Sequence, residues 1–388
     1  MGDHRIVPAD GDLDSLIDAL HGRAAAAAPR PAQHTTGTLD AWLAAVRELD
    51  GSDLLLVAGR PPMVRTGDRF HAANVEVLDS DDIVAAVRDL LPATAAGRYE
   101  AGAAVDAAFT RPGLGRFRLN LHRERGRAAV AIRALPMRVP ELPALRFSHD
   151  VARLSQLPRG LVLIGGPTGS GKTTTLAALV SLINAREARH IITIEDPIEY
   201  EHAHGQSVIE QIEVGIDVAD FPTALRAAMR QAPDVLVIGE MRDPETMRIA
   251  LAAAETGHLV LATVHATDAG AAVSRITDAF PTERQNAVRQ ELAMSLAAVL
   301  TQTLVPAADS TRIPIAELLV VSYGARQHIR KNALQHLNQE VTMTRKLGSF
   351  TFEESLARSV RAGLLAAEDA RLRAHHPEEF DSLLNSSF

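Results

Sequence analysis

A glycine-rich loop at residues 166–173 is the feature that most constrains the fold of this 388-residue chain. It reads Gly-Pro-Thr-Gly-Ser-Gly-Lys-Thr and fits the phosphate-binding pattern G-x-x-x-x-G-K-[ST]. The apolar run at 161–164 before it is typical of a buried strand, and residues 174–184 after it are typical of a helix. This strand, loop and helix order is the context that the motif requires. It predicts a nucleoside triphosphate site rather than an ordinary glycine-rich turn.

Each residue type in the loop suits contact with phosphate. Glycines let backbone N–H groups curl around an anion, and the N-terminus of the following helix adds partial positive charge. A lysine at this position reaches the β- and γ-phosphates, and the next hydroxyl holds Mg²⁺. We therefore expect ATP and Mg²⁺ as ligands. The expected binding residues are Gly166, Pro167, Thr168, Gly169, Ser170, Gly171, Lys172, Thr173 and Thr174, with Thr173 on the metal.

Beyond the loop, the sequence predicts two domains and a tail. From residue 151, short apolar strands alternate with helical patterns, which indicates an α/β core with a mainly parallel sheet. A smaller α+β module precedes this core, and three prolines between residues 136 and 143 indicate a linker. We assign residues 1–36 to a weakly structured tail, 37–136 to the N-terminal domain, 137–150 to the linker and 151–388 to the core. From about residue 271 we expect mostly helices, including one over residues 292–305.

The composition narrows the class of protein. A net charge of −8 argues against a protein that mainly coats nucleic acid, so no direct nucleic-acid partner is expected. Cysteine is absent, which excludes disulfides and thiolate zinc sites and fits a cytoplasmic protein. No apolar run is long enough to predict a transmembrane segment.

Two acidic residues at strand ends are candidates for roles in nucleotide hydrolysis. Glu195 ends the apolar run at 191–194, and Glu240 follows the run at 235–238. Strand C-termini line the ligand crevice of a parallel sheet, so Glu195 could hold Mg²⁺ or orient water. Gly239 occupies the usual Walker B aspartate position, which leaves Glu240 as the candidate for activating water. The alternative for each is a solvated turn at the end of a buried strand.

Histidines and arginines complete the candidate site. His258 and His265 bracket another apolar strand, where they could sense the γ-phosphate or be ordinary satisfied histidines. Arginines crowd the end of the N-terminal domain, and Arg226 and Arg230 lie four residues apart before the Glu240 strand. Charge that develops during phosphoryl transfer can be stabilised by such guanidinium groups.

Four segments, taken in chain order, resemble the type II/IV secretion ATPases. They are the glycine-rich loop, then Ile-Thr-Ile-Glu-Asp-Pro-Ile-Glu, then Gly-Glu-Met-Arg-Asp, and finally Ala-Ala-Glu-Thr-Gly-His-Leu-Val. More narrowly, they are similar to the type IV pilus retraction motors of twitching motility. The resemblance implies a RecA-like P-loop core with an N-terminal PAS-like domain, assembled as a homo-hexamer. It also implies a cytoplasmic motor held at the inner membrane through a pilus platform protein.

The resemblance also implies roles for single residues. Glu195 becomes the Asp-box acid, Glu240 the catalytic Walker B glutamate, and His258 and His265 the His-box pair. Arg118 and Arg133 become the N-domain arginines that reach the γ-phosphate, and Arg226 and Arg230 match the pair before the Walker B strand.

One segment departs from the family pattern. The family signature Ala-Ile-Arg-Asn-Leu-Ile-Arg appears only as Gly-Ala-Arg-Gln-His-Ile-Arg at residues 324–330. This leaves open a pilus-extension, accessory, secretion or conjugation ATPase of the same superfamily. A nucleotide-gated assembly scaffold with little turnover is the remaining alternative.

Overall fold

The computed structural model describes residues 38–386 apart from 74 and 92. The predicted tail, residues 1–36, lies outside the described residues. The remaining chain divides into two compact units. One holds the described residues up to Asp106 together with Leu119–Ala134, and the other holds Ala107–Arg118 and the chain from Leu135 onward. The division passes through the β-hairpin at residues 105–124 and again between Ala134 and Leu135, next to the predicted linker at 137–150. The predicted domain bounds stay predictions.

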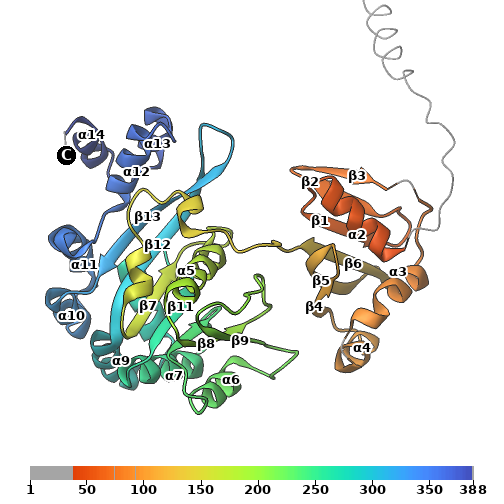
Figure 1. Cartoon of the computed structure of the whole chain (residues 1–388), viewed down its shortest axis with the longest axis horizontal. Helices are drawn as coiled ribbons and strands as arrows, with labels where there is room; N and C mark the ends of the chain where they lie inside the picture. The colour runs from red at the N-terminus through yellow and green to blue at the C-terminus, as the bar shows by residue number, and fades with distance from the viewer. Residues whose placement is uncertain (1–37, 74, 92, 387–388) are drawn as a thin grey trace, which may run out of the picture. The chain divides into compact units, whose positions relative to one another are not determined.

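The smaller module is built on a six-stranded sheet (Figure 1). Its strand order is β3-β2-β1-β6-β5-β4, and β1 pairs antiparallel with both β2 and β6. Helix α2 buries Leu39, Trp42, Leu43 and Val46, which recur at helical spacing. Its strands are β1 (Asp53–Val57), β2 (Met63–Thr66), β3 (Arg69–Ala72), β4 (Val105–Arg111), β5 (Gly115–Glu124) and β6 (Arg127–Ala134), and its helices are α2 (Leu39–Glu48), α3 (Ser80–Val87) and α4 (Ala93–Glu100).

The larger unit is built on a seven-stranded sheet, in the order β13-β12-β7-β11-β10-β8-β9. Six strands run parallel, and only the edge strand β13 is antiparallel to its neighbour β12. The strands are β7 (Gly160–Gly165), β8 (His190–Glu195), β9 (Val208–Glu213), β10 (Val235–Ile238), β11 (Leu259–Val264), β12 (Leu296–Pro306) and β13 (Arg312–Val320). The apolar runs at 161–164, 191–194 and 235–238 and the run between His258 and His265 form β7, β8, β10 and β11, as predicted.

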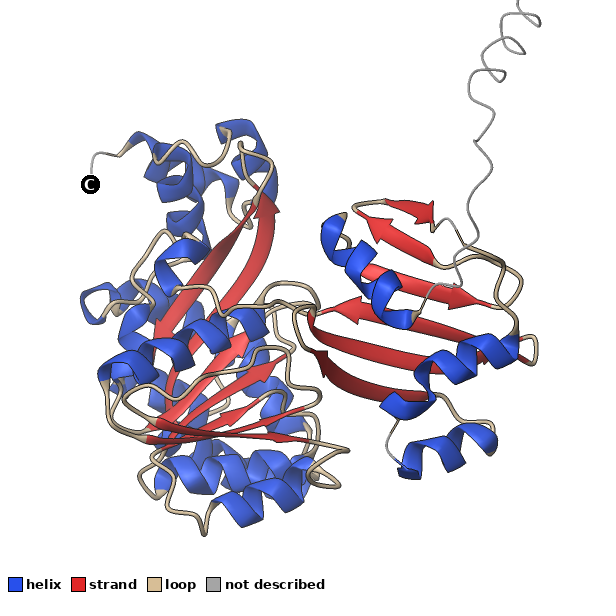
Figure 2. Cartoon of the chain, turned by 45° about the vertical axis from the view of Figure 1, so that its right-hand side comes forward, coloured by secondary structure: helices blue, strands red, loops and turns tan. Residues whose placement is uncertain are grey.

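Helices cover both faces of this sheet (Figure 2), so its central strands are buried on both sides. Alternate residues divide between two hydrophobic clusters: Leu161 and Leu163 of β7 join one, and Val162 and Ile164 the other. Helix α5 packs with the second cluster, and α6 to α11 contribute to the first. Their bounds are α5 (Lys172–Arg186), α6 (Phe221–Ala228), α7 (Pro244–Glu255), α8 (Ala269–Asp278), α9 (Thr282–Ser295), α10 (Tyr323–Arg330) and α11 (Leu337–Met343).

The predicted helix over residues 292–305 is wrong. Helix α9 ends at Ser295, and β12 begins at Leu296 and lies beside the central strand β7. The polar residues from 301 to 303, which interrupt the apolar stretch and led us to expect a packed helix, lie in the part of β12 that follows its apolar start. Beyond β13 follow the helices α12 (Phe352–Arg361), α13 (Ala367–Arg373) and α14 (Pro377–Asn385). They form a third hydrophobic cluster with the end of β12 and the start of β13.

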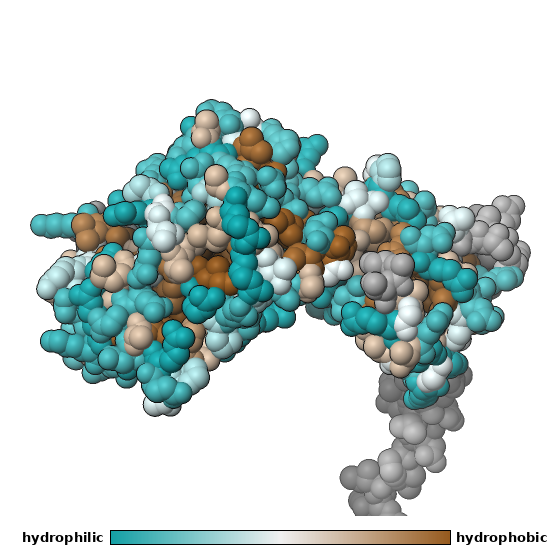
Figure 3. Space-filling view, turned by 90° about the horizontal axis from the view of Figure 1, so that it is seen from below, coloured by the Kyte–Doolittle hydropathy of each residue, from teal (hydrophilic) through white to brown (hydrophobic). Residues whose placement is uncertain are grey.

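Hydrophilic residues cover most of the face seen in Figure 3, with smaller hydrophobic patches between them. Among the described residues, no helix is both long enough and apolar enough to cross a bilayer.

Candidate nucleotide-binding site

The glycine-rich loop leaves the C-terminal end of β7 and leads into α5, in the middle of the parallel sheet. Gly171 precedes the helix with φ 85°, a conformation that glycine adopts at little cost. A Cβ at Gly166 would overlap the carbonyl oxygen of Gln302 and the hydroxyl of Ser170. Two loop glycines are therefore required by the backbone path and by close packing. The loop has the form of a cradle for an anion.

The start of α5 leaves hydrogen-bond donors for such an anion. The first N–H groups of a helix lack partners within the helix, and no side chain caps this one. The buried hydroxyl of Ser170 also has no hydrogen-bond partner among the described residues. A phosphate group in the loop would satisfy donors of this kind.

Lys172 closes the loop from the first turn of α5. Its ammonium donates to the carbonyl oxygens of Gly166 and Pro167, both at 2.9 Å. Burial lowers the pKa of Lys172, while the nearby carboxylates of Glu240 and Glu199 partly oppose this effect. The Lys172 ammonium therefore lies at the turn of the loop, the position of a phosphate-binding lysine, and two acidic groups lie near it.

Glu240 is the acidic group that the sheet places near Lys172. It follows β10, whose neighbour β11 leads to His265, and His265 Nε2 lies 3.0 Å from Glu240 Oε1. Arg242 donates to Glu240 Oε2 at 2.7 Å. Burial opposes ionisation, but Arg242, His265 and Lys172 more than offset it, so the pKa of Glu240 is lowered. Glu240 is therefore ionised at neutral pH and able to accept a proton.

Glu195 lies at the end of the neighbouring strand β8. Its Oε1 accepts hydrogen bonds from Thr193 at 2.8 Å and from Gln211 at 3.1 Å. Burial raises its pKa to about 6. Gly239 stands beside it, and a Cβ there would come within 3.3 Å of the Glu195 Cα atom. This close packing gives a physical reason for glycine at the usual Walker B aspartate position.

His258 is not part of this cluster. It precedes Leu259, which pairs with Gly160 at the start of β7, whereas the glycine-rich loop follows the end of β7. A strand of this length separates its two ends by roughly 20 Å. The His258 ring instead lies 2.9 Å from the carbonyl oxygen of Ala253. The structure thus brings only His265 of the predicted pair to the Glu240 carboxylate.

Partners outside the Glu240 cluster are seen for Arg226, Arg230 and Arg133. Arg226 pairs with Glu245 at the start of α7, and Arg230 donates to the carbonyl oxygen of Arg226 at 2.9 Å. Arg133 on β6 donates to Asp53 at 2.9 Å, and Arg118 is exposed on β5. The roles of all four arginines at the nucleotide stay predictions.

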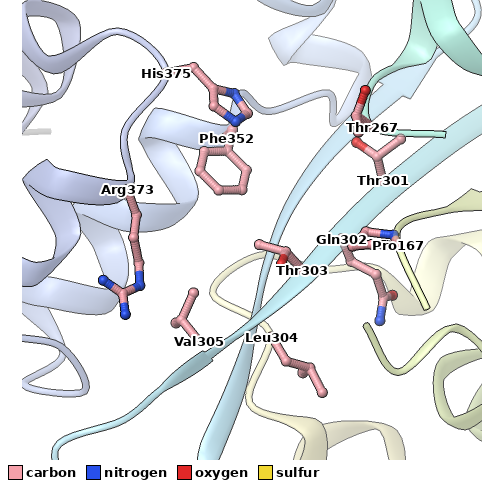
Figure 4. A pocket seen from close by; sticks show the side chains of 10 residues that line it. All are labelled: Pro167, Thr267, Thr301, Gln302, Thr303, Leu304, Val305, Phe352, Arg373 and His375. Atoms are coloured by element: carbon pink, nitrogen blue, oxygen red, sulfur yellow. The ribbon is translucent and has the colours of Figure 1, made fainter. Parts of the chain in front are cut away.

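A cavity of about 320 Å³ adjoins the loop (Figure 4). Pro167 lines it together with β12 residues, including Gln302, and with Phe352, Arg373 and His375 from the C-terminal region. Its volume lies within the usual range of small-molecule sites, roughly 300–1,000 Å³. The cavity gives space beside the loop for a ligand larger than phosphate alone.

Sequence reasoning missed four polar residues near the site: Thr193 and Gln211, which bind Glu195; Tyr200, whose hydroxyl lies 3.0 Å from that of Thr174; and Gln302. The signal for Gln302 was present, because polar residues follow an apolar run there as they do after β8 and β10. We interpreted that run as a helix, and so assigned no site role to it.

Comparison with known proteins then decides the family. The family model for type II/IV secretion system proteins matches residues 127–361, more than half of the chain. The chain belongs to the type II/IV secretion system protein family. The resemblance predicted from the motifs is therefore confirmed.

Individual secretion system proteins match most of the chain. The type IV pilus retraction ATPase PilT of Pseudomonas aeruginosa is 38% identical over 329 residues, which are 85% of this chain and 96% of that protein. A twitching motility protein of Neisseria gonorrhoeae is 40% identical over 319 residues, which are 82% of this chain and 85% of that protein. A crystal structure of the pilus retraction motor PilT with bound ADP has a TM-score of 0.80 and 37% identity. That match covers 89% of this chain and 99% of the other. The predicted α/β fold with a P-loop core is confirmed.

Proposed function

We propose that this secretion system protein is an ATPase motor that hydrolyses ATP to drive type IV pilus retraction in twitching motility. The observation that carries the proposal is the cluster of Lys172, Glu240 and His265 at an anion cradle, in a chain similar over most of its length to a pilus retraction ATPase. The cluster contains the groups that phosphoryl transfer needs. The similarity indicates that ATP hydrolysis would serve pilus retraction.

Binding begins at the glycine-rich loop. The open N–H groups at the start of α5 hold the phosphates of the nucleotide, and Ser170 gains a partner for its hydroxyl. The Lys172 ammonium exchanges its bonds to the carbonyl oxygens of Gly166 and Pro167 for bonds to phosphate oxygens. That exchange favours binding because phosphate oxygens carry negative charge and carbonyl oxygens do not, so the new bonds join opposite charges.

Hydrolysis depends on Glu240. Its lowered pKa keeps the carboxylate ionised, so that it can accept a proton from the attacking water. His265 and Arg242 occupy one carboxylate oxygen each, and they fix the plane of the group. Such a fixed base costs no reorganisation when the water reacts.

The residues present fit a Mg²⁺ ion. Magnesium takes oxygen ligands, and the Thr173 hydroxyl at the start of α5 and the Glu195 carboxylate at the end of β8 would supply them. One Glu195 oxygen already accepts two hydrogen bonds, which leaves the other for the ion. When bound, the ion neutralises charge on the phosphates. With a pKa of about 6, Glu195 is largely ionised at neutral pH and suited to this role.

The proposal extends to assembly and location. The motor acts as a homo-hexamer in the cytoplasm, peripheral to the inner membrane. There it binds a pilus platform protein and transmits its conformational change to that protein. Arg118, Arg133, Arg226 and Arg230 complete the nucleotide site by stabilising negative charge on the γ-phosphate.

Deletion of the gene tests the proposed process. We expect excess surface pili and loss of surface motility, both restored by the unsubstituted gene. The Glu255→Gln gene should restore motility equally well, because Glu255 is an exposed residue of α7. The Glu240→Gln gene should fail to restore it. Loss of pili on deletion would contradict retraction and indicate extension.

A further inference from the structure

Gln302 lies where the sheet meets the glycine-rich loop. Strand β12 runs parallel to β7, and its Thr301 pairs with Gly165, the last residue of β7. Gln302 is therefore the next β12 residue beside Gly166, where the loop begins. Only 4% of Gln302 is exposed, so its amide is removed from bulk water.

Both ends of the Gln302 amide bind the loop–helix unit. Its Nε2 donates to the carbonyl oxygen of Ser170 at 2.7 Å, and its Oε1 accepts from the Thr175 hydroxyl at 2.9 Å. Thr175 is itself 1% exposed. One planar amide thus joins the loop to the first turns of α5.

The bond to Ser170 has a consequence for the next peptide group. A trans peptide is planar, and its C=O and N–H point in opposite directions. With the Ser170 carbonyl held by Gln302, the N–H of Gly171 is directed away from β12. Rotation of this peptide would break a buried hydrogen bond and leave polar atoms unsatisfied, which costs free energy.

We infer that Gln302 is a positioning residue that holds the glycine-rich loop in its phosphate-binding form. It does not contact the reacting atoms; it acts through Ser170 and Thr175. The inference rests on the proposed nucleotide function. The polar contacts distinguish this role from packing, because a side chain of equal size without an amide would fill the same space.

The test compares ADP affinity with stability in the full-length chain. Gln302→Met keeps the volume but removes both hydrogen bonds, and Thr175→Val removes one. We expect each to raise the Kd for ADP, measured by calorimetry, with about a tenfold increase for Gln302→Met. Thr175→Ser keeps the hydroxyl and should bind ADP as the unsubstituted chain does.

The matched control is Thr277→Val. Thr277 is a buried threonine whose hydroxyl donates to the carbonyl oxygen of Val273 at 2.9 Å within α8, outside the loop. We expect the control to lower the unfolding midpoint without nucleotide about as much as Thr175→Val does, with no change in ADP affinity. Equal loss of ADP affinity in the control would assign the effect to general destabilisation and overturn the inference.

Two results separate the inference from the proposed function. If the unsubstituted chain binds ADP and Gln302→Met binds it equally well, the role of Gln302 is wrong and the proposed function stands. If Gln302→Met does not fold, the Thr175→Val and Thr175→Ser pair decides, since equal affinity in both would overturn the inference. If the unsubstituted chain binds no ADP, the proposed function itself is wrong.

Discussion

At the scale of single residues, the site combines Lys172 with two carboxylates of different character. Glu240 is kept ionised by three cationic or histidine neighbours, whereas Glu195 is a largely buried acid whose pKa is raised to about 6. Environments that separate two titratable groups in this way are typical of sites that divide chemical roles. The difference fits a base at Glu240 and a metal ligand at Glu195.

Lys172→Ala should weaken ATP binding by at least about tenfold, because a charge-assisted hydrogen bond contributes roughly 1.5–3 kcal/mol. The measurement is the Kd for ATP by calorimetry. Lys346→Ala is the control, since Lys346 is exposed in a short turn before α12. Unchanged affinity in the Lys172 variant would remove this lysine from the phosphate site.

Glu195→Gln should raise the free energy of unfolding at pH 7.5 by up to about 2 kcal/mol. Because burial raises the folded-state pKa of Glu195 from 4.5 to about 6, the folded chain retains a proton that the unfolded chain has lost between these values. Stability from this group therefore falls as pH rises through that window. Urea unfolding at pH 4.5 and 7.5 measures the effect, which should be much smaller at pH 4.5, where the folded chain holds the proton and the unfolded chain is half protonated. The exposed Glu255→Gln serves as control, and an equal change in both variants would refute the prediction.

At the scale of elements, the site forms where the C-terminal ends of neighbouring strands lie side by side. The ends of β7, β8, β10 and β11 supply the loop, Glu195, Glu240 and His265, and β12 supports the loop through Gln302. Long apolar runs made four of these strands predictable, because a strand buried on both faces has no polar alternation. Strand β12 was missed because we interpreted its apolar run and the polar residues 301–303 after it as a helix. Gln302 was therefore not assigned to the site, because only the pairing of β12 with β7 places it beside the loop. The distance of His258 from the loop likewise became clear only from the strand direction.

Gly239→Ala should lower stability by about 1–3 kcal/mol, because the added Cβ would lie 3.2 Å from the Ile194 carbonyl oxygen and press on Glu195. Chemical unfolding measures the loss. Gly97→Ala is the matched control in α4, where a Cβ meets nothing within 4 Å. That variant should gain up to about 1 kcal/mol from helix propensity. Equal effects at both positions would show that the strand ends are not tightly packed.

At the scale of the whole molecule, we expect the chain to assemble into a homo-hexamer. The proposed motor is a ring of six 41.6-kDa chains, and light scattering after size-exclusion chromatography with ADP should give the corresponding mass. A sample that stays monomeric at every concentration would contradict the hexamer, while the nucleotide site within one chain could still stand.

The central claim is that Glu240 activates water for ATP hydrolysis at this site. Steady-state phosphate release by the purified full-length chain, with ATP and Mg²⁺, measures it most directly. We expect Glu240→Gln to slow release by about 10²-fold or more while ADP affinity is retained, and Glu255→Gln to leave the rate unchanged. Phosphate release by Glu240→Gln at the rate of the unsubstituted chain would contradict the claim.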